Sequence, residues 1–374
     1  MQKFTNIYRL GIKELWGLAR DPVMLILIVY CFTASIYTAA TAVPDSLNLA
    51  SVAVVDEDDS PLSRQIIGAF YPPLFNKPAK ISLNEMDPGM DEDKYTFVLN
   101  IPPNFQRDVL KGDSPTIQLN VDATRMSQAF TGNGYIQQIV IDEVNEFVKR
   151  YRSSDILPVN LEVHTSFNPN LTQSWFSSVT EIINMVTTLS IILTGAALMR
   201  EREHGTIEHL LAMPVTPFEI MTSKVWSMGL VVLIATACSL LLIVEGALKV
   251  PITGSKWLFL WGAVLHLFAT TSMGIFLATV ARSMAQFGML LMLILLPLQM
   301  LSGGSTPRES MPELVQTIML IAPTTHFVEL GQAILYRGAG LETVWKPFLW
   351  LITLGTGFFI FALTRFRKTI TQMT

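Results

Sequence analysis

Charged residues are scarce in this chain, and their scarcity argues against a soluble protein. Only 15% of the 374 residues are charged, whereas a soluble domain carries about 25%. The apolar residues that take their place form long runs toward both ends and leave a polar stretch over residues 44–173. This pattern predicts several membrane spans and one polar domain inserted between them.

Cysteine is almost missing, which excludes a disulfide framework for the polar stretch. The only two cysteines, Cys31 and Cys238, both lie inside apolar runs. The polar domain therefore has to fold on its own hydrophobic core, and the two thiols are expected to be inert small side chains.

Several signatures of chemistry are also missing. The sequence has no phosphate-binding loop of the Walker type, no Gly-x-Ser-x-Gly and no His-Glu-x-x-His, so we expect neither nucleotide hydrolysis nor these hydrolase mechanisms. No block of basic residues indicates nucleic-acid binding. His204 and His209 are five residues apart, about 140° around a helix, and do not share a face as a zinc pair would. We expect a non-catalytic chain without a metal or cofactor of its own.

The acidic run Asp56–Asp59 is the strongest candidate for a metal site in the polar stretch. Its spacing lacks the glycine and the terminal glutamate of a calcium loop. A solvated turn after a strand is the favoured interpretation, because charge runs usually mark surface.

Six apolar segments are long enough, or nearly so, to cross a membrane, for which about 20 residues are needed. The fifth is short, contains Pro297 and runs into Ser302-Gly303-Gly304, so we expect the chain to break or turn there. The six segments are Pro22–Val43, Trp175–Met199, Lys224–Val250, Trp257–Ala281, Ala285–Leu301 and Trp345–Thr364.

The distribution of Lys and Arg predicts the orientation. With the N-terminus inside, the short inner segments hold eleven of these residues and the short outer segments five. The excess predicts that both termini are cytoplasmic and that residues 44–173 face outward. The first apolar run is longer than the 7–15 residues or so of a signal peptide, which favours an uncleaved anchor.

Residues 1–21 precede the first span and are expected to form an amphipathic helix in the membrane interface, because apolar residues recur there at helical spacing. Pro22 then redirects the chain into the bilayer. The apolar face consists of Phe4, Ile7, Tyr8, Ile12, Leu15, Trp16 and Ala19.

The polar stretch alternates strand and helix signals, which predicts a small α/β domain. Strands are expected at Ala50–Val55, Tyr95–Ile101, Thr116–Val121 and near Val159–Phe167. Helices are expected at Leu62–Phe70, Phe105–Lys111 and Met126–Tyr151.

The second span is unusually polar. Asn184, Thr188 and Thr194 are able to line one side of it, and a polar side belongs against protein or a water-filled path. The alternative is helix packing through small polar residues. These three residues, together with Gln299, are therefore candidates for lining a pathway, and helix packing stays open as the alternative.

The loop at residues 200–223 joins the second and third spans. Thr206 can cap a short helix, Ile207–Met213, which Pro214 ends, and Pro217 starts the next helix. The short helix presents an apolar stripe of Ile207, Leu210 and Leu211, and an exposed stripe indicates a partner. The alternative is a loop folded against the ends of its own spans.

The run that begins at Arg200, Arg-Glu-Arg-Glu-x-Gly-Thr-x-Glu-x-Leu, resembles the coupling-helix region of ABC-2 type permeases. So do the later motifs Pro297-Leu-Gln-Met-Leu-Ser-Gly-Gly-Ser-Thr-Pro307, Met311-Pro312, Pro323-Thr-Thr-His326-Phe and Arg337-Gly338. In the polar stretch, Asp56-x-Asp58 and Ile101-Pro-Pro-Asn-Phe105 are similar to the export branch with a long outer loop. The resemblance covers nearly the whole chain.

The resemblance implies an α-helical bacterial inner-membrane protein with six transmembrane helices, whose residues 302–344 form an outer re-entrant segment. Two permease chains, most simply a homodimer, form a pathway amid membrane lipid, and each docks a separate ATPase that binds ATP and magnesium. Such exporters move drugs, lipids, polysaccharides or peptides, and the outer domain meets a periplasmic adaptor. The residues implied in coupling are Arg202, Glu203, Gly205, Thr206, Ile207, Glu208, Leu210, Leu211, Pro214, Pro217 and Glu219.

Two other functions compete with a permease. A membrane-anchored outer binding or scaffold protein would need one span, so further spans would be superfluous. A membrane-embedded enzyme would need a cluster of catalytic groups at membrane depth, which the sequence does not offer.

Overall fold

The computed structural model describes residues 2–42, 49–92, 94–122, 126–151, 173–203, 205, 215–306 and 308–371. The chain forms two compact units. Met1–Ala42 and Gln173–Thr374 form the first, here called the transmembrane unit, and Val43–Thr172 form the second, here called the sheet unit. Each is described by itself.

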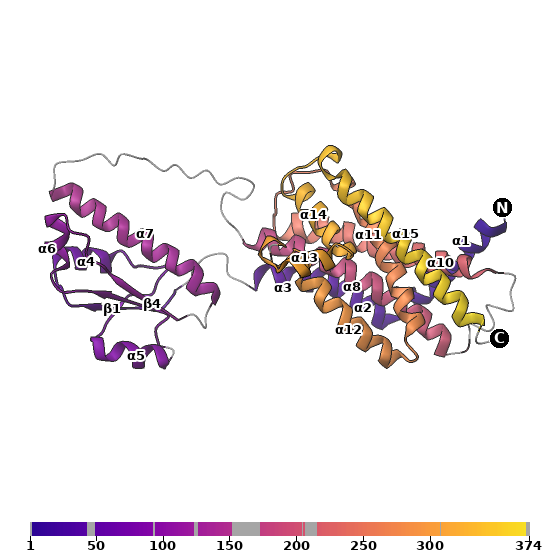
Figure 1. Cartoon of the computed structure of the whole chain (residues 1–374), viewed down its shortest axis with the longest axis horizontal. Coiled ribbons are helices and arrows are strands. Elements are labelled where there is room, and N and C mark those ends of the chain that lie inside the picture. The colour runs from indigo at the N-terminus through magenta and orange to yellow at the C-terminus, as the bar shows by residue number, and fades with distance from the viewer. Residues whose placement is uncertain are drawn as a thin grey trace. The chain divides into compact units, whose positions relative to one another are not determined.

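Among the described residues of the transmembrane unit, five helical runs are long and apolar enough to cross a membrane, so the chain is a multi-pass helical membrane protein (Figure 1). The first run joins α2 (Pro22–Tyr30), the π-helical turn η1 (Cys31–Ser35) and α3 (Ile36–Thr41). The others are α8 (Gln173–Glu203), α10 (Pro217–Ser239) continued by the π-helical η2 (Leu240–Ala247), α11 (Lys256–Val280) and α15 (Leu341–Thr371).

The fifth expected span, Ala285–Leu301, differs from the rest. It forms α12 (Met284–Met300), whose 17 residues rise about 25 Å, less than the roughly 30 Å of a bilayer core. The chain then turns at Gly303, where φ is 94°. It continues through η3 (Arg308–Ser310), α13 (Glu313–Met319) and α14 (Pro323–Leu335). Because α13 and α14 are bent by 90°, they form one broken span or a re-entrant segment.

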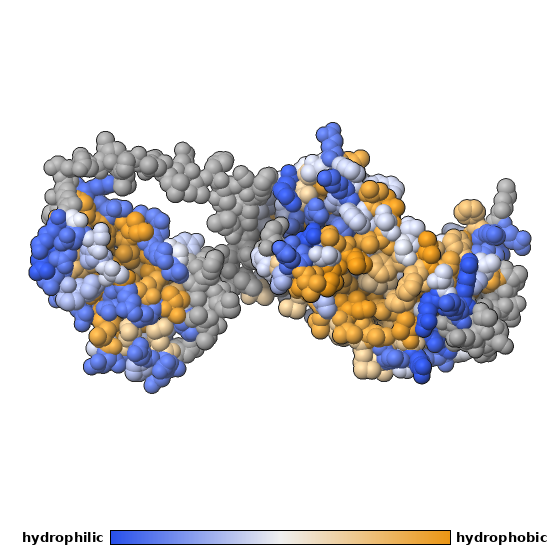
Figure 2. Space-filling model, in the orientation of Figure 1, coloured by the Kyte–Doolittle hydropathy of each residue, from blue (hydrophilic) through white to orange (hydrophobic). Residues whose placement is uncertain are grey.

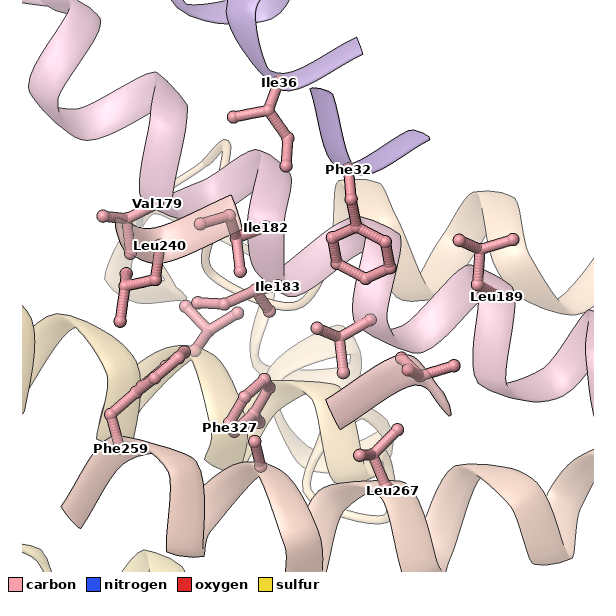
Figure 3. Close-up of a cluster of buried hydrophobic side chains, with 14 of the residues drawn as sticks. Phe32, Ile36, Val179, Ile182, Ile183, Leu189, Leu240, Phe259, Leu267 and Phe327 are labelled. Carbon is pink, nitrogen blue, oxygen red and sulfur yellow. The ribbon is translucent and has the colours of Figure 1, made fainter. Parts of the chain in front are cut away.

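The centre of the transmembrane unit is the pair α8 and α11. Their most apolar windows are 78% and 72% buried, against 22–39% for the other three runs. In Figure 3, side chains such as Phe32, Ile182, Phe259 and Phe327 point into a common interior from four different helical segments. In lipid, packing rather than water exclusion holds such helices together. Hydrophobic residues form a band across the middle of the unit, with hydrophilic residues at its two ends (Figure 2).

The predicted amphipathic helix is α1 (Gln2–Ala19), and it packs along α10. Gly11 permits the close contact, since a Cβ there would lie 2.1 Å from the ring of Trp226. Phe4, Tyr8 and Trp16 of α1 are exposed, and the ring of Tyr8 also stacks on that of Trp226, with 6.2 Å between the ring centroids. Asp21 caps the following helix by accepting a hydrogen bond from the amide of Met24 at 3.2 Å.

The described residues of the sheet unit form four strands in the order β2-β1-β3-β4, with β1 parallel to β2 and β3, and β4 antiparallel to β3. Alternate residues of β1 and β3 enter two different cores, as the pleat requires. The strands are β1 (Val52–Asp56), β2 (Ala79–Lys80), β3 (Phe97–Ile101) and β4 (Gln118–Val121).

In the described part of this unit, four helices accompany the sheet, with α4, α6 and α7 on one face and α5 on the other (Figure 1). The sequence did not predict β2 or α5, because β2 has two residues and Pro88-Gly89 inside α5 resemble a helix end. The strand expected near Val159–Phe167 lies outside the described residues. The helices are α4 (Pro61–Gly68), α5 (Leu83–Asp91), α6 (Phe105–Lys111) and α7 (Met126–Tyr151).

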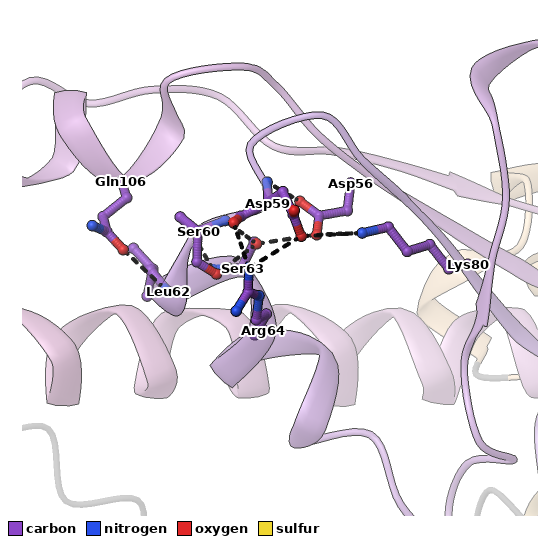
Figure 4. Close-up of polar contacts among 8 residues, drawn as sticks. All are labelled: Asp56, Asp59, Ser60, Leu62, Ser63, Arg64, Lys80 and Gln106. Carbon is purple, nitrogen blue, oxygen red and sulfur yellow. Dashed lines mark hydrogen bonds and ion pairs between the residues drawn. The ribbon is translucent and has the colours of Figure 1, made fainter.

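The acidic run after β1 is occupied by contacts within the sheet unit (Figure 4). Asp56 accepts the amide of Asp59 at 2.9 Å and pairs with Lys80 at 3.3 Å. Asp58 accepts the amide of Gln106 at 3.0 Å in the first turn of α6. Hydrogen bonds and the ion pair with Lys80 lower the pKa of Asp59. Across the part of the chain that the structure describes, no group of three potential metal ligands occurs.

Candidate functional site: the ends of the α8–α10 loop

The expected coupling loop is described at its two ends. Arg202, Glu203 and Gly205 lie at the end of α8, and Pro217 and Glu219 lie in the first turn of α10. The predicted helix Ile207–Met213 lies outside the described residues, as do Thr206, Ile207, Glu208, Leu210, Leu211 and Pro214.

The last four residues of α8 bind different parts of the unit. Arg200 donates to the carboxylate of Asp21 at 2.6 Å, at the corner between α1 and α2. Glu201 accepts from Lys13 of α1 at 3.1 Å and pairs with Lys224 of α10 at 2.8 Å. Two neighbouring side chains thereby attach the end of α8 to three other helices.

Arg202 and Glu203 bind the ends of the next two helices. Arg202 donates to the carbonyls of Ala278 and Ala281, each at 2.7 Å, at the end of α11. Glu203 accepts the amide of Met284, the first residue of α12, at 2.8 Å. Helix ends leave such groups without partners inside the helix. Both charges also have the sign that the helix dipole favours at these ends.

The start of α10 is fixed by a capping box. Thr216 is the N-cap and Pro217 occupies the first turn, where its missing N–H costs nothing. The carboxylate of Glu219 accepts the amide and the hydroxyl of Thr216, at 2.6 and 2.8 Å. Asn6 of α1 donates to the same carboxylate at 3.3 Å. Glu219 therefore links the loop's second end to α1.

Beneath the loop ends lies a set of charges that we call the lysine–glutamate cluster: the buried Glu14, Glu201 and Lys224, with the half-exposed Lys13 at its edge. The Lys224 side chain is 1% exposed, and its ammonium lies 2.9 Å from Glu14 and 2.8 Å from Glu201. Burial raises the pKa of Glu14, and the charge of Lys224 opposes that shift. Removing one partner from a buried set of this kind costs about 3–5 kcal/mol, because the remaining charge is left uncompensated.

This arrangement is suited to mechanical coupling. The loop ends contact α1 through Glu201 and Glu219, α11 through Arg202 and α12 through Glu203. Each contact is a charged or capping hydrogen bond, which is stronger than a neutral one. The loop ends are thus tied to elements on several sides of the unit.

The predicted pathway-lining residues do not share one environment. Gln299 of α12 donates to the hydroxyl of Thr188 at 2.9 Å, and Asn184 is half-buried one turn away. Thr194 is fully buried and donates to the carbonyl of Ser190 at 2.6 Å, inside its own helix. Asn184, Thr188 and Gln299 therefore lie together on one side, and Thr194 faces the interior of this chain.

A second polar row joins α8 to α11. Thr187 is hydrogen-bonded to His266 at 2.8 Å, and Ser190 donates to Thr270 at 2.6 Å. The small polar residues of α8 thus serve helix packing on this side, the alternative that the sequence left open.

Sequence reasoning missed Glu14 and Lys224 as members of the site. A signal was present: Glu14 is the one acidic residue of residues 2–19, and Lys224 is a charge within the first two turns of an apolar span. A charge in such a position requires a partner of opposite sign.

Comparisons with known proteins agree on one family. Residues 22–364 match the model described as "ABC-2 family transporter protein". The chain is 62% identical over 373 residues to "Inner membrane transport permease YhhJ" of Escherichia coli (strain K12), covering 100% of both chains. It is 28% identical over 375 residues to "Probable multidrug ABC transporter permease YbhR" of the same organism, covering 97% of this chain and 99% of that one. For "Probable multidrug ABC transporter permease YbhS" the identity is 23% over 348 residues, covering 90% and 89%.

Proposed function

This chain belongs to the ABC-2 transporter family, and from that premise we propose that it is the membrane-spanning subunit of an ATP-driven exporter. In this proposal it forms the pathway across the bacterial inner membrane, and a separate ATPase supplies the energy. The ATPase docks on the loop between α8 and α10. The absence of a Walker-type loop from the sequence supports a motor on another chain.

The observation that supports coupling best is the run Arg200–Glu203. Its four side chains bind the α1–α2 corner, α1 with α10, the end of α11 and the start of α12. A loop that served only to connect two spans would not need contacts with so many elements. Five apolar helical runs also favour a permease over a scaffold that needs a single anchor.

The test is co-expression of the full chain with a candidate ABC ATPase, followed by pull-down and ATPase measurement. Leu211→Asp places a charge in the apolar stripe and is expected to weaken the pull-down about tenfold or more, as for an interface anchor. Glu203→Gln is expected to weaken it as well. Lys94→Gln, in the sheet unit, is the matched control.

Pull-down that survives both loop substitutions at the control level would remove the coupling role. Full function of the sheet unit on a single membrane anchor would instead favour the binding or scaffold protein.

Outward transport, a second permease copy and an adaptor contact complete the proposal. Two relatives carry the words "multidrug ABC transporter permease" in their names, which supports export of drug-like compounds. Asn184, Thr188 and Gln299 form a polar, half-buried surface on α8 and α12. This surface supports a pathway that is shared with a second copy of the chain. Crosslinking through Asn184→Cys tests whether a second copy of the chain lies against this surface. Dye accumulation in cells tests whether transport is outward.

A further inference from the structure

A polar pocket of about 520 Å³ lies at the end of the transmembrane unit away from the α8–α10 loop. Phe176, in the first turn of α8, lines it, whereas Arg200–Glu203 end the same helix. The turn after α12 contributes Ser302 and Ser305. The volume lies within the range of ordinary ligand sites, about 300–1,000 Å³, and it exceeds what one small ion needs.

The charge of this pocket is positive. Arg308 and Arg337 line it, and Glu329 is the one carboxylate among the lining residues. Within the described ranges, neither arginine forms an ion pair. The Nε atom of Arg308 is buried without a hydrogen-bond partner, and its Nη2 reaches only the carbonyl of Gln316, at 3.5 Å. A guanidinium presents a fork of donors that matches phosphate oxygens.

Thr325 provides an independent indication of a ligand. It lines the pocket, is 3% exposed and has a hydroxyl without a hydrogen-bond partner among the described residues. Buried polar groups are nearly always paired in native proteins. Thr325 also lies in the first turn of the 13-residue helix α14, where the helix dipole favours an anion.

We propose that this pocket binds a phosphate group, held by Arg308, Arg337 and the hydroxyl of Thr325. The phosphate belongs either to a lipid headgroup or to a free anion. This binding site goes beyond the proposed function and does not depend on coupling to an ATPase.

The experiment uses the purified full chain in a neutral detergent. Native mass spectrometry measures binding of three probes: inorganic phosphate, a short-chain phosphatidylglycerol and the matching diacylglycerol, which has no phosphate. Arg308→Gln and Arg337→Gln are each expected to weaken binding of the phosphate-bearing probe about tenfold or more, because each removes charge-assisted hydrogen bonds. Thr325→Val keeps the shape of the side chain but removes its hydroxyl, and it is expected to weaken binding of the phosphate-bearing probe several-fold. Lys249→Gln removes an exposed charge outside the pocket and is expected to change nothing.

Binding of phosphatidylglycerol alone, weakened by the arginine variants, supports the site and identifies a lipid headgroup. Binding of inorganic phosphate as well supports the site with a free anion as ligand. Equal binding of diacylglycerol, or binding unchanged in both arginine variants, overturns the proposal.

Two further measurements separate the causes of a negative result. Arg337 is exposed, so we expect Arg337→Gln to fold. If Arg308→Gln fails to fold, binding of the phosphate-bearing probe by Arg337→Gln tests the site. ATPase pull-down with Arg337→Gln is expected to match the unsubstituted chain. ATPase pull-down that survives in the Leu211→Asp variant counts against coupling and not against the pocket.

Discussion

Arg202 and Glu203 end α8 by binding groups that α11 and α12 leave unpaired at their own ends. This use of charge differs from a surface ion pair, which contributes little to stability. The half-buried guanidinium of Arg202 donates to the carbonyls of Ala278 and Ala281, which would otherwise have to accept hydrogen bonds from water. The same residues therefore contribute to the stability of the transmembrane unit and belong to the proposed coupling site.

Arg202→Met keeps the length of the side chain and removes the guanidinium. We expect unfolding of the transmembrane unit to become easier by about 1.5–3 kcal/mol, the usual contribution of hydrogen bonds to a charged group. Thermal unfolding in detergent measures this effect. Arg282→Met, an exposed arginine just after α11, is the control, and equal melting temperatures for the two variants would contradict the role of Arg202.

Glu14 predicts a specific pH dependence. Its pKa in the folded chain is raised by burial, so the folded state keeps this proton to higher pH than the unfolded state does. Its contribution to stability is complete below the ordinary glutamate pKa of about 4.3 and is lost as the pH rises through the raised value. Compared with Glu14→Gln, which does not titrate, the unsubstituted chain is expected to lose melting temperature across that window. A difference that stays constant or grows with pH would refute this assignment.

The close contact of α8 and α11 depends on a glycine. A Cβ at Gly274 would lie 2.6 Å from the carbonyl oxygen of Ile191, a backbone atom that cannot move aside. The hydrogen bond between Thr187 and His266 and the one from Ser190 to Thr270 join the same two helices. The most buried pair of the unit thus combines a steric requirement with a polar one.

Gly274→Ala is therefore expected to destabilise the transmembrane unit by about 1–3 kcal/mol through overpacking. Gly288→Ala on α12 is the matched control, because a Cβ there meets nothing within 4 Å and alanine favours a helix by up to about 1 kcal/mol. Thermal unfolding of both variants decides the matter. If Gly274→Ala melts no lower than the control, the two helices do not need this contact.

At the scale of elements, local signals predicted much of the structure. Phe105–Lys111 and Met126–Tyr151 were expected as helices and are α6 and α7, because apolar periodicity and neighbouring turn residues mark their ends. The capping pair Thr216 and Pro217 likewise marked the start of α10. The lysine–glutamate cluster was not predicted, since the partners Glu14 and Lys224 are 210 residues apart and no local pattern pairs them.

Considered as a whole, the chain has apolar spans whose flanking charges predict one orientation. The excess of Lys and Arg in the short loops on the same side as the N-terminus predicts that both termini are cytoplasmic and that the sheet unit faces outward. The exposed aromatic side of α1, with Phe4, Tyr8 and Trp16, suits the inner interface of the same membrane.

Cysteine labelling tests this orientation. The experiment starts from a chain with Cys31→Ala and Cys238→Ala, which has no cysteine of its own. Lys111→Cys, in the sheet unit, is expected to react with a membrane-impermeant maleimide in intact cells. Lys3→Cys and Lys368→Cys are expected to react only after the cells are permeabilised. Labelling of either terminal cysteine in intact cells would reverse the predicted topology.

The distance along the chain between Glu14 and Lys224 also has a consequence for biosynthesis. The ribosome makes Glu14 210 residues before Lys224, which at about 5–20 residues per second is a delay of about 10–40 s. In that interval the first span and the whole sheet unit are made, while α1 awaits the charge that neutralises its carboxylate. A nascent chain that stops short of α10 has an N-terminal helix with an unpaired glutamate, and only a chain translated past that point can bury it.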